Sequence, residues 1–390
     1  MRRVVLCVCL SLALFLHTAV SAEQALFTRS EPCPVDVLFP LAREMALRTP
    51  VSHSEKVVSF FETQIHSDST SPRRGSDFST RTIPLVLMNL STCELVETSV
   101  TRHINQSAVA TMLSSNDGRF IVFVEPRPYG ALWNWWNTPL QVLAPEQWVV
   151  AAIHWTLRPS GESVAYTPGS ADLMNSFPSL VEIGRYHVRG DIQKAYEILE
   201  KTNSRALPHQ TIPDVIETYF PRLLESIISI EHADDHEVAE YRSGAYAVNP
   251  IDRPFAVIGA NPERAYSITR SPVGARGLMQ VMPKTCRETR PLYGYPVPAG
   301  CSTDSHSHPT ELASAMIIID DHLSALMQRL RKGTESRDAF CRRPEIKLML
   351  RASYNTGPRR VGTAIKKEKD WASRLLRETR GYLVKAFGLD

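Results

Sequence analysis

The sequence predicts an α+β protein in which a mixed α/β N-terminal domain precedes a predominantly α-helical C-terminal domain. Residues 83–88 and 120–124 are rich in β-branched and other apolar side chains, which is typical of strands. Apolar residues recur at helical spacing between residues 172 and 201, and again between residues 312 and 330. The spacing of residues 34–63 also predicts a helix, so the N-terminal half is expected to be mixed.

Length and composition indicate a folded protein of two domains. The chain has 390 residues, of which 43% are hydrophobic and 22% charged. This balance is that of a globular protein, and the length suits two domains of ordinary size. The net charge of +3 is too small, and the basic residues too dispersed, to indicate a nucleic-acid partner. We therefore expect none.

The first residues predict a secretory signal peptide, residues 1–22. Arg2 and Arg3 precede an apolar run that ends near Phe15, and Ala22 closes a short stretch of small residues suited to cleavage. The run is short for a bilayer span, which takes roughly 20 residues. An uncleaved anchor is the alternative. We expect an exported, periplasmic protein that is soluble after cleavage.

The cysteines outside this segment suit an oxidising compartment. They are Cys33, Cys93, Cys286, Cys301 and Cys341. Cys286 and Cys301 bracket a loop rich in Pro and Gly, and Cys33 with Cys93 is the natural second pair, which leaves Cys341 unpaired. Connectivity cannot be derived from sequence alone. No cysteine spacing resembles a zinc site.

The domain boundary is expected in a segment with two prolines, residues 204–213. Residues 23–204 would form the N-terminal domain, and residues 205–390 the C-terminal domain. Most tryptophans lie between Trp133 and Trp155. They could form a platform for sugar rings, but a tryptophan-rich core or inter-domain contact is the more common arrangement.

The run of residues 271–283 (SPVGARGLMQVMP) is the most informative segment. Gly274 and Gly277 permit open backbone dihedrals or a close approach to another group. Gln280 lies among apolar residues, so its amide needs a partner in the protein or in a ligand. The segment could form the wall of a polar cleft, or a tight turn that leads into a core helix.

The segment after Pro221 predicts a helix with a carboxyl group on its apolar face. Leu224, Ile227, Ile228 and Glu231 share one face at a spacing of 3.6 residues. Burial there should raise the pKa of Glu231, as a general acid near neutral pH requires. The alternative is a carboxylate that turns to solvent at the end of the helix.

Four pieces of the chain together resemble the soluble lytic transglycosylase family, lysozyme-like enzymes that cleave the glycan strands of peptidoglycan. The pieces are the helix that ends at Glu231 and residues 271–283, 352–358 (ASYNTGP) and 378–385 (ETRGYLVK). The resemblance covers the C-terminal half only. It implies a lysozyme-like fold and no metal or cofactor.

The resemblance also implies roles for single residues. Glu231 would protonate the glycosidic oxygen and then act as base toward the C6 hydroxyl of the muramoyl residue, closing a 1,6-anhydro ring. Six residues would bind the substrate or hold the glutamate: Ser271, Gln280, Met282, Tyr354, Asn355 and Tyr382. The implied partner is the peptidoglycan glycan strand, and the N-terminal domain could bind an envelope protein.

Two departures from the family pattern carry consequences. His232 follows the glutamate where the family usually has serine, and residues 238–268 resemble an insertion that must loop out for Ser271 to meet Glu231. His232 and His236 share a helical face and could bind a metal, and Asp234 or Asp235 could act as the second carboxylate of a muramidase. A wall-binding module with a decayed site is the third alternative. We expect the His and Asp residues of the cluster 231–237 instead to be solvated in a loop.

Overall fold

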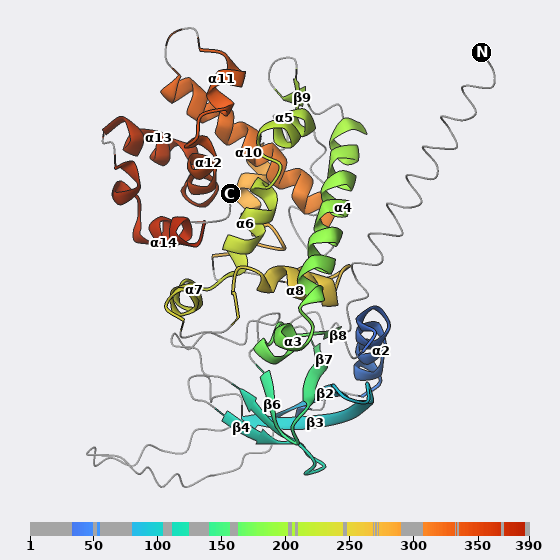
Figure 1. Ribbon diagram of the computed structural model, residues 1–390. Coiled ribbons are helices and arrows are strands. Elements are labelled where there is room, and N and C mark those ends of the chain that lie inside the picture. The colour runs from blue at the N-terminus through green and yellow to red at the C-terminus, as the bar shows by residue number, and fades with distance from the viewer. Residues whose placement is uncertain are drawn as a thin grey trace, which may run out of the picture.

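The computed structural model describes residues 33–49, 53–54, 80–103, 111–124, 140–156, 163–201, 205–206, 210–244, 248–267, 269, 271, 273–289, 307–331, 333, 335–367 and 370–386. The predicted signal peptide, residues 133–136 of the tryptophan cluster and Cys301 lie outside them. Figure 1 shows strands β2 to β8 at one end of the molecule and α10 to α14 at the other, with α4 and α8 between.

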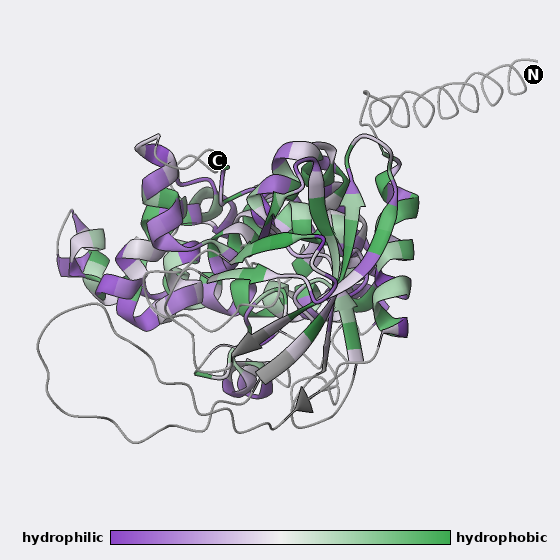
Figure 2. Cartoon of the chain, turned by 90° about the horizontal axis from the view of Figure 1, so that it is seen from below, coloured by the Kyte–Doolittle hydropathy of each residue, from purple (hydrophilic) through white to green (hydrophobic). Residues whose placement is uncertain are grey.

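A five-stranded antiparallel sheet forms the centre of the N-terminal part. Its order is β1-β2-β7-β8, and β3 pairs with the other edge of β2. The strands are β1 (His53–Ser54), β2 (Thr80–Asn89), β3 (Leu95–His103), β7 (Trp148–Thr156) and β8 (Ser163–Tyr166). Leu85 and Leu87 of β2 point into one core while Val86 and Met88 point into a second, so both faces of the sheet are covered. Figure 2 shows hydrophobic stretches along the strands, interrupted by hydrophilic residues.

Shorter strands complete the β-structure. A three-stranded sheet has the order β4-β5-β6, and β9 pairs with β10. Their bounds are β4 (Thr111–Ser114), β5 (Ile121–Val124), β6 (Leu140–Ala144), β9 (Arg205–Ala206) and β10 (Gln210–Thr211). The strands predicted at residues 83–88 and 120–124 are thus confirmed in β2 and β5. Trp148 and Trp155 pack against the core, with the Trp148 ring edge-on to Phe120 at 5.1 Å.

The helix predicted over residues 34–63 is shorter than expected. Helix α2 (Val35–Arg48) covers one face of the sheet, and His53 and Ser54 already form strand β1. Pro50 explains the early end, because a proline disfavours the helical conformation of the residue before it. A disulfide between Cys33 and Cys93 ties the start of α2 to the β2–β3 turn, which confirms that pair.

Helices dominate the rest of the chain, so the predicted α+β class is confirmed. In chain order they are α3 (Ala171–Ser176), α4 (Ser179–Lys201), α5 (Ile212–Tyr219), α6 (Leu223–His232), α7 (Asp235–Arg242), α8 (Arg253–Ala260), α9 (Pro283–Thr289), α10 (His308–Leu330), α11 (Arg337–Cys341), α12 (Ile346–Thr356), α13 (Pro358–Lys367), the 3-10 helix η4 (Trp371–Arg374) and α14 (Arg377–Ala386). The largest hydrophobic core runs from the sheet through α4 and α6 into α10 and α12.

The expectation that residues 238–268 loop out is wrong for α8. This helix is buried almost throughout and crosses α4, which lies on the other side of the predicted domain boundary. At the crossing, a methyl group on Gly184 or on Gly259 would overlap the backbone of the facing helix. Only glycine permits this approach. Asn261 then bonds both the N–H and the C=O of buried Thr167 beside β8.

The other two cysteines of the C-terminal half that the structure describes differ in their bonding. Cys286 is disulfide-bonded, and its expected partner Cys301 lies outside the described residues. Cys341 is free and buried. Among the described residues, no helix combines the length and the apolar character that crossing a membrane requires.

Candidate active site

Helix α6 carries Glu231 at its C-terminal end, as the apolar spacing predicted. The helix begins at Leu223, two residues later than Pro221 suggested, and Leu224, Ile227 and Ile228 are buried. Since these residues anchor one face in the core, Glu231 is held next to that core while its side chain stays half-buried. The helix therefore presents a carboxyl group at the boundary between core and solvent.

The surroundings of Glu231 favour the protonated carboxyl near neutral pH. Burial raises the pKa of Glu231 to about 7, against the opposing effects of a hydrogen bond from Tyr382 and the charge of Lys385. The Tyr382 hydroxyl donates to Glu231 Oε1 at 3.0 Å. The predicted rise in the pKa of Glu231 is thus confirmed. The group can donate a proton and can then be stabilised as an anion by the phenol.

Helices α12 and α14 bring Tyr354, Asn355 and Tyr382 to the same side of the molecule. The Tyr354 hydroxyl donates to Met279 O at 2.8 Å, and its pKa is raised by burial and by the charge of Glu231. Asn355 Oδ1 accepts from the hydroxyl of Thr379, a buried residue of α14, at 2.8 Å. This bond joins the end of α12 to the helix that carries Tyr382.

Residues 273–282 form turns and not a helix. The backbones of Arg276 and Val281 pair as an isolated bridge, and α9 begins only at Pro283. Ser271 Oγ accepts from Ala275 N at 2.9 Å, within its own turn. The amide of Gln280 finds its partner in Gly277 O at 2.7 Å. Met282 is 37% exposed and lies at the end of the segment.

His232 differs from what the sequence suggested. It is not solvated but buried, its Nε2 lies 2.7 Å from Leu278 O, and its ring stacks on Tyr266 at 3.7 Å. Burial lowers the pKa of His232 to about 3, so the imidazole is neutral. His236 instead lies in α7, with Nδ1 3.3 Å from Glu240. Within the described residues, no three His, Cys, Asp or Glu side chains are grouped so that they could hold a metal ion.

The acidic residues after His232 start a helix and do not form a loop. Asp234 caps α7 by accepting from His236 N and Glu237 N, and Asp235 Oδ1 lies 3.0 Å from Lys385 Nζ. These residues line a pocket of about 660 Å³ next to the end of α6, together with Ala233, His236, Ala239 and Lys385.

Lys385 is near Glu231 but was not among the site residues predicted from the sequence. It is buried, donates to Ala233 O at 3.0 Å, and lowers the pKa of Glu231 by its charge. Its position three residues after Tyr382 places both side chains on one face of α14, and this spacing was a signal that could have identified it. Glu311 carried no such signal.

Glu311 is the second buried carboxyl group near the turn. It lies in the first turn of α10 and accepts from Leu278 N. Burial raises the pKa of Glu311 to about 7. A methyl group on Gly277 would overlap this carboxyl, so glycine at 277, with φ +74°, permits the close approach of the turn to α10.

Comparison with known proteins yields a match over part of the C-terminal half. No curated protein and no solved structure matches the chain. A family model described as the transglycosylase SLT domain matches residues 261–376. The match includes the turn and the Tyr354–Asn355 pair, whereas Glu231 and Tyr382 lie outside it. The helical C-terminal part is consistent with the expected lysozyme-like fold. Residues 261–376, in the C-terminal half of the chain, are thus similar to a domain of the lytic transglycosylase family, whose members act on peptidoglycan outside the cytoplasm.

Proposed function

We propose that the protein is a peptidoglycan lytic transglycosylase with Glu231 as its single acid/base. Glu231 donates its proton to the oxygen of the β-1,4 bond between N-acetylmuramic acid and N-acetylglucosamine, and the bond from C1 to that oxygen breaks. The C6 hydroxyl of the muramoyl residue then attacks C1 and returns its proton to Glu231. The products are a free 4-hydroxyl and a 1,6-anhydromuramoyl end, and no water is consumed.

The observation that carries this proposal is the half-buried carboxyl of Glu231 beside the Tyr382 hydroxyl. A general acid must be protonated at the working pH, and burial raises the pKa of Glu231 to about 7. It must also become an anion after it has donated, and the hydrogen bond from Tyr382 at 3.0 Å favours that form. Tyr354 and Asn355 lie on the adjoining helix, suited to hold the sugar.

The surroundings of the nearby carboxylates favour the transglycosylase over a hydrolase. A muramidase of this type needs a second carboxylate as nucleophile or base. Asp234 accepts two backbone N–H groups at the start of α7, and Asp235 pairs with Lys385. Both carboxylates therefore already have structural partners. An attack by the substrate's own hydroxyl needs only the one glutamate.

We place Ser271, Gln280 and Met282 on the wall of the glycan-binding cleft, and residues 205–390 in the catalytic domain. Residues 23–204 would form the N-terminal domain and bind the wall or an envelope protein. Cleavage of the segment 1–22 would release the protein into the periplasm, where its substrate lies.

Digestion of purified sacculi tests the proposal. Mass spectrometry of the released fragments should detect 1,6-anhydro ends. Reducing ends would instead identify a muramidase, and the absence of release a binding module. Glu231→Gln should lower the rate by roughly 10²- to 10⁴-fold. Glu225→Gln, on the same helix but paired with Arg189, is the matched control and should stay active. Equal activity of the two variants would refute the assignment of Glu231.

A further inference from the structure

Backbone atoms of residues 278 and 279 are bound from three different helices. The N–H of Leu278 donates a hydrogen bond to the Glu311 carboxyl of α10. Leu278 O lies 2.7 Å from His232 Nε2 at the end of α6. The next carbonyl, that of Met279, accepts from the Tyr354 hydroxyl of α12 at 2.8 Å. Side chains from three helices therefore hold the turn that contains Gln280, in addition to the backbone bonds between Arg276 and Val281.

The chemistry of His232 determines the direction of its bond. Its pKa is lowered by burial to about 3, so the ring is neutral and carries one proton. A carbonyl oxygen only accepts, and this proton is therefore on Nε2, from which it is donated to Leu278 O. The imidazole acts as a fixed donor and does not titrate in the working range of a general acid.

The inserted segment supplies the surface on which His232 rests. Tyr266, near its end, is fully buried and stacks on the imidazole with an angle of 27° between the rings. The preceding residue, Ala265, is held by its carbonyl, which lies 2.6 Å from His308 Nε2. Residues 238–268 thus provide one of the ring contacts of the residue next to Glu231.

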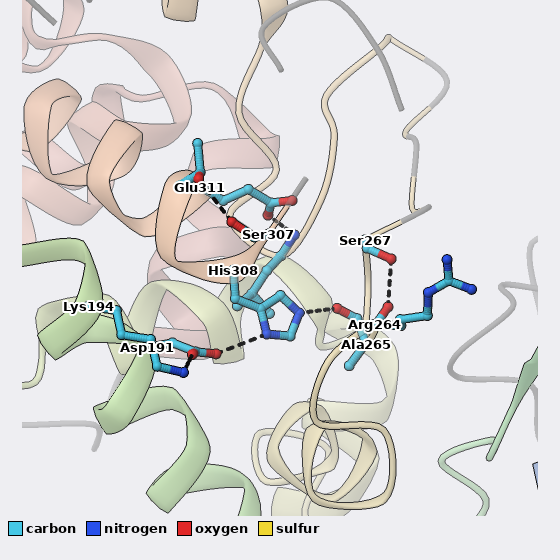
Figure 3. A network of polar contacts seen from close by, with 10 residues as sticks. Asp191, Lys194, Arg264, Ala265, Ser267, Ser307, His308 and Glu311 are labelled. Atoms are coloured by element: carbon cyan, nitrogen blue, oxygen red, sulfur yellow. Dashed lines mark hydrogen bonds and ion pairs between the residues drawn. The ribbon is translucent and has the colours of Figure 1, made fainter. Parts of the chain in front are cut away.

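A polar network centred on α10 connects the residue before Tyr266 with the helix that carries Glu311 (Figure 3). His308 of α10 lies between the Ala265 carbonyl and Asp191 of α4, with Nδ1 3.3 Å from Asp191. Lys194 pairs with the same aspartate at 3.1 Å. Glu311 follows His308 by one helical turn and binds Leu278. One helix therefore orients both Ala265, before Tyr266, and Leu278.

We propose that His232 is a positioning residue that, with Glu311, clamps the Leu278 peptide and fixes the turn of residues 277–280 relative to Glu231. The two departures from the family pattern then contribute to the same ring contact. Histidine replaces the usual serine, and the inserted segment provides the tyrosine that holds its ring. The role of the turn as a cleft wall rests on the proposed function, but the clamp itself does not.

Two substitutions of His232 separate positioning from folding. His232→Gln keeps an N–H donor near the position of Nε2, and His232→Leu removes it while keeping an apolar side chain. The measurement is kcat and KM on purified, uncrosslinked glycan strands. We expect His232→Leu to lower kcat/KM by roughly 10- to 100-fold, as loss of a buried hydrogen bond implies, and His232→Gln to recover at least a tenth of the wild-type value. Folded His232→Leu within twofold of the wild type would overturn the proposal.

If the leucine variant does not fold, nitrogen-15 NMR of the unmodified protein tests the proposed bond from His232 to Leu278. The His232 imidazole should carry its proton on Nε2 from about pH 5 to 8, and this proton should exchange slowly with solvent. Glu311→Gln should shift the Nε2–H resonance through the shared Leu278 peptide. A proton on Nδ1, or titration of the ring in this range, would overturn the proposal. Lack of cleavage by the wild type would instead count against the proposed function and leave this measurement valid.

Discussion

Glu231 and Glu311 have the same raised pKa but opposite surroundings. Burial raises the pKa of each carboxyl to about 7. Glu311 is 5% exposed and binds the backbone N–H of Leu278. Glu231 is half-buried at the end of α6, and its partner is the Tyr382 hydroxyl. One carboxyl supports the turn from behind, whereas the other faces the boundary with solvent.

This difference shows that a shifted pKa indicates burial and does not by itself identify a catalytic group. A general acid has to reach the substrate and exchange its proton with it. Glu311 is covered by the turn that it binds, since the contact leaves no room for a methyl group at Gly277. Glu231 has a partner that can stabilise its anion, and the residue is half-buried. Exposure to solvent and the hydrogen-bond partner therefore distinguish the general acid proposed at Glu231 from the structural carboxyl of Glu311.

The largest expected effect is on the pH dependence of stability. Each carboxyl has a folded pKa of about 7, raised from an ordinary 4.5, so its stabilising effect is complete below pH 4.5 and is lost as the pH rises through 7. The loss is about 3 kcal/mol for each group. Glu231→Gln and Glu311→Gln should each reduce the drop in free energy of unfolding between pH 4 and pH 8 by this amount, as measured by urea denaturation.

The two variants should differ in activity. At pH 5 Glu231→Gln should be as stable as the wild type or more stable, but inactive. Glu311→Gln should also keep most of its stability at this pH, because its amide oxygen can accept from Leu278 N as the protonated carboxyl does. It should retain measurable activity. If Glu311→Gln were the inactive variant and Glu231→Gln the active one, the assigned roles would be reversed.

The next effect concerns the closeness of Gly277 to Glu311. Gly277→Ala places a methyl group against the carboxyl, at a φ of +74° that alanine also disfavours, and should cost about 2 kcal/mol. Gly274→Ala is the matched control, since its φ is +94° but nothing lies within 4 Å of the added methyl group. It should cost about 1 kcal/mol. Equal thermal midpoints for the two variants would mean that the turn does not depend on its contact with Glu311.

Local patterns were sufficient to predict several of the helices, two of the strands and the position of Glu231. The apolar residues Leu224, Ile227 and Ile228 define the face of α6 that is buried, and Glu231 follows on that face. Strands β2 and β5 were predicted in the same way, from β-branched and apolar runs. These features depend on side chains that are neighbours along the chain, so spacing alone reveals them.

Contacts between distant segments could not be predicted from the sequence. Gly184 and Gly259 each look like a weak point in a helix, and only their mutual approach explains how α8 enters the core. In the same way, His232 next to an acidic cluster suggests solvent or a metal. Its partners, Leu278 and Tyr266, are far along the chain, and no spacing rule connects them to it.

The smallest effect tests the partner that distinguishes Glu231 from Glu311. Tyr382→Phe removes the hydrogen bond that favours the ionised carboxyl, so the pKa of Glu231 should rise above its present value of about 7. The acid then stays protonated to higher pH, and the alkaline limb of kcat/KM should move upward by up to about 1 pH unit. Near pH 6 the rate should fall about tenfold, because the anion formed after proton donation is less stabilised.

Tyr354→Phe is the matched control for this change. Its hydroxyl donates to Met279 O and not to the glutamate, so its loss should lower activity and leave the alkaline limb in place. If the alkaline limb of kcat/KM shifted to lower pH in Tyr382→Phe, the phenol would instead favour the protonated acid. A limb that moved equally in both variants would assign the effect to the whole wall of the cleft. Only a shift confined to Tyr382→Phe makes this hydroxyl the specific partner of the acid, which is the property that Glu311, bound by backbone N–H groups, lacks.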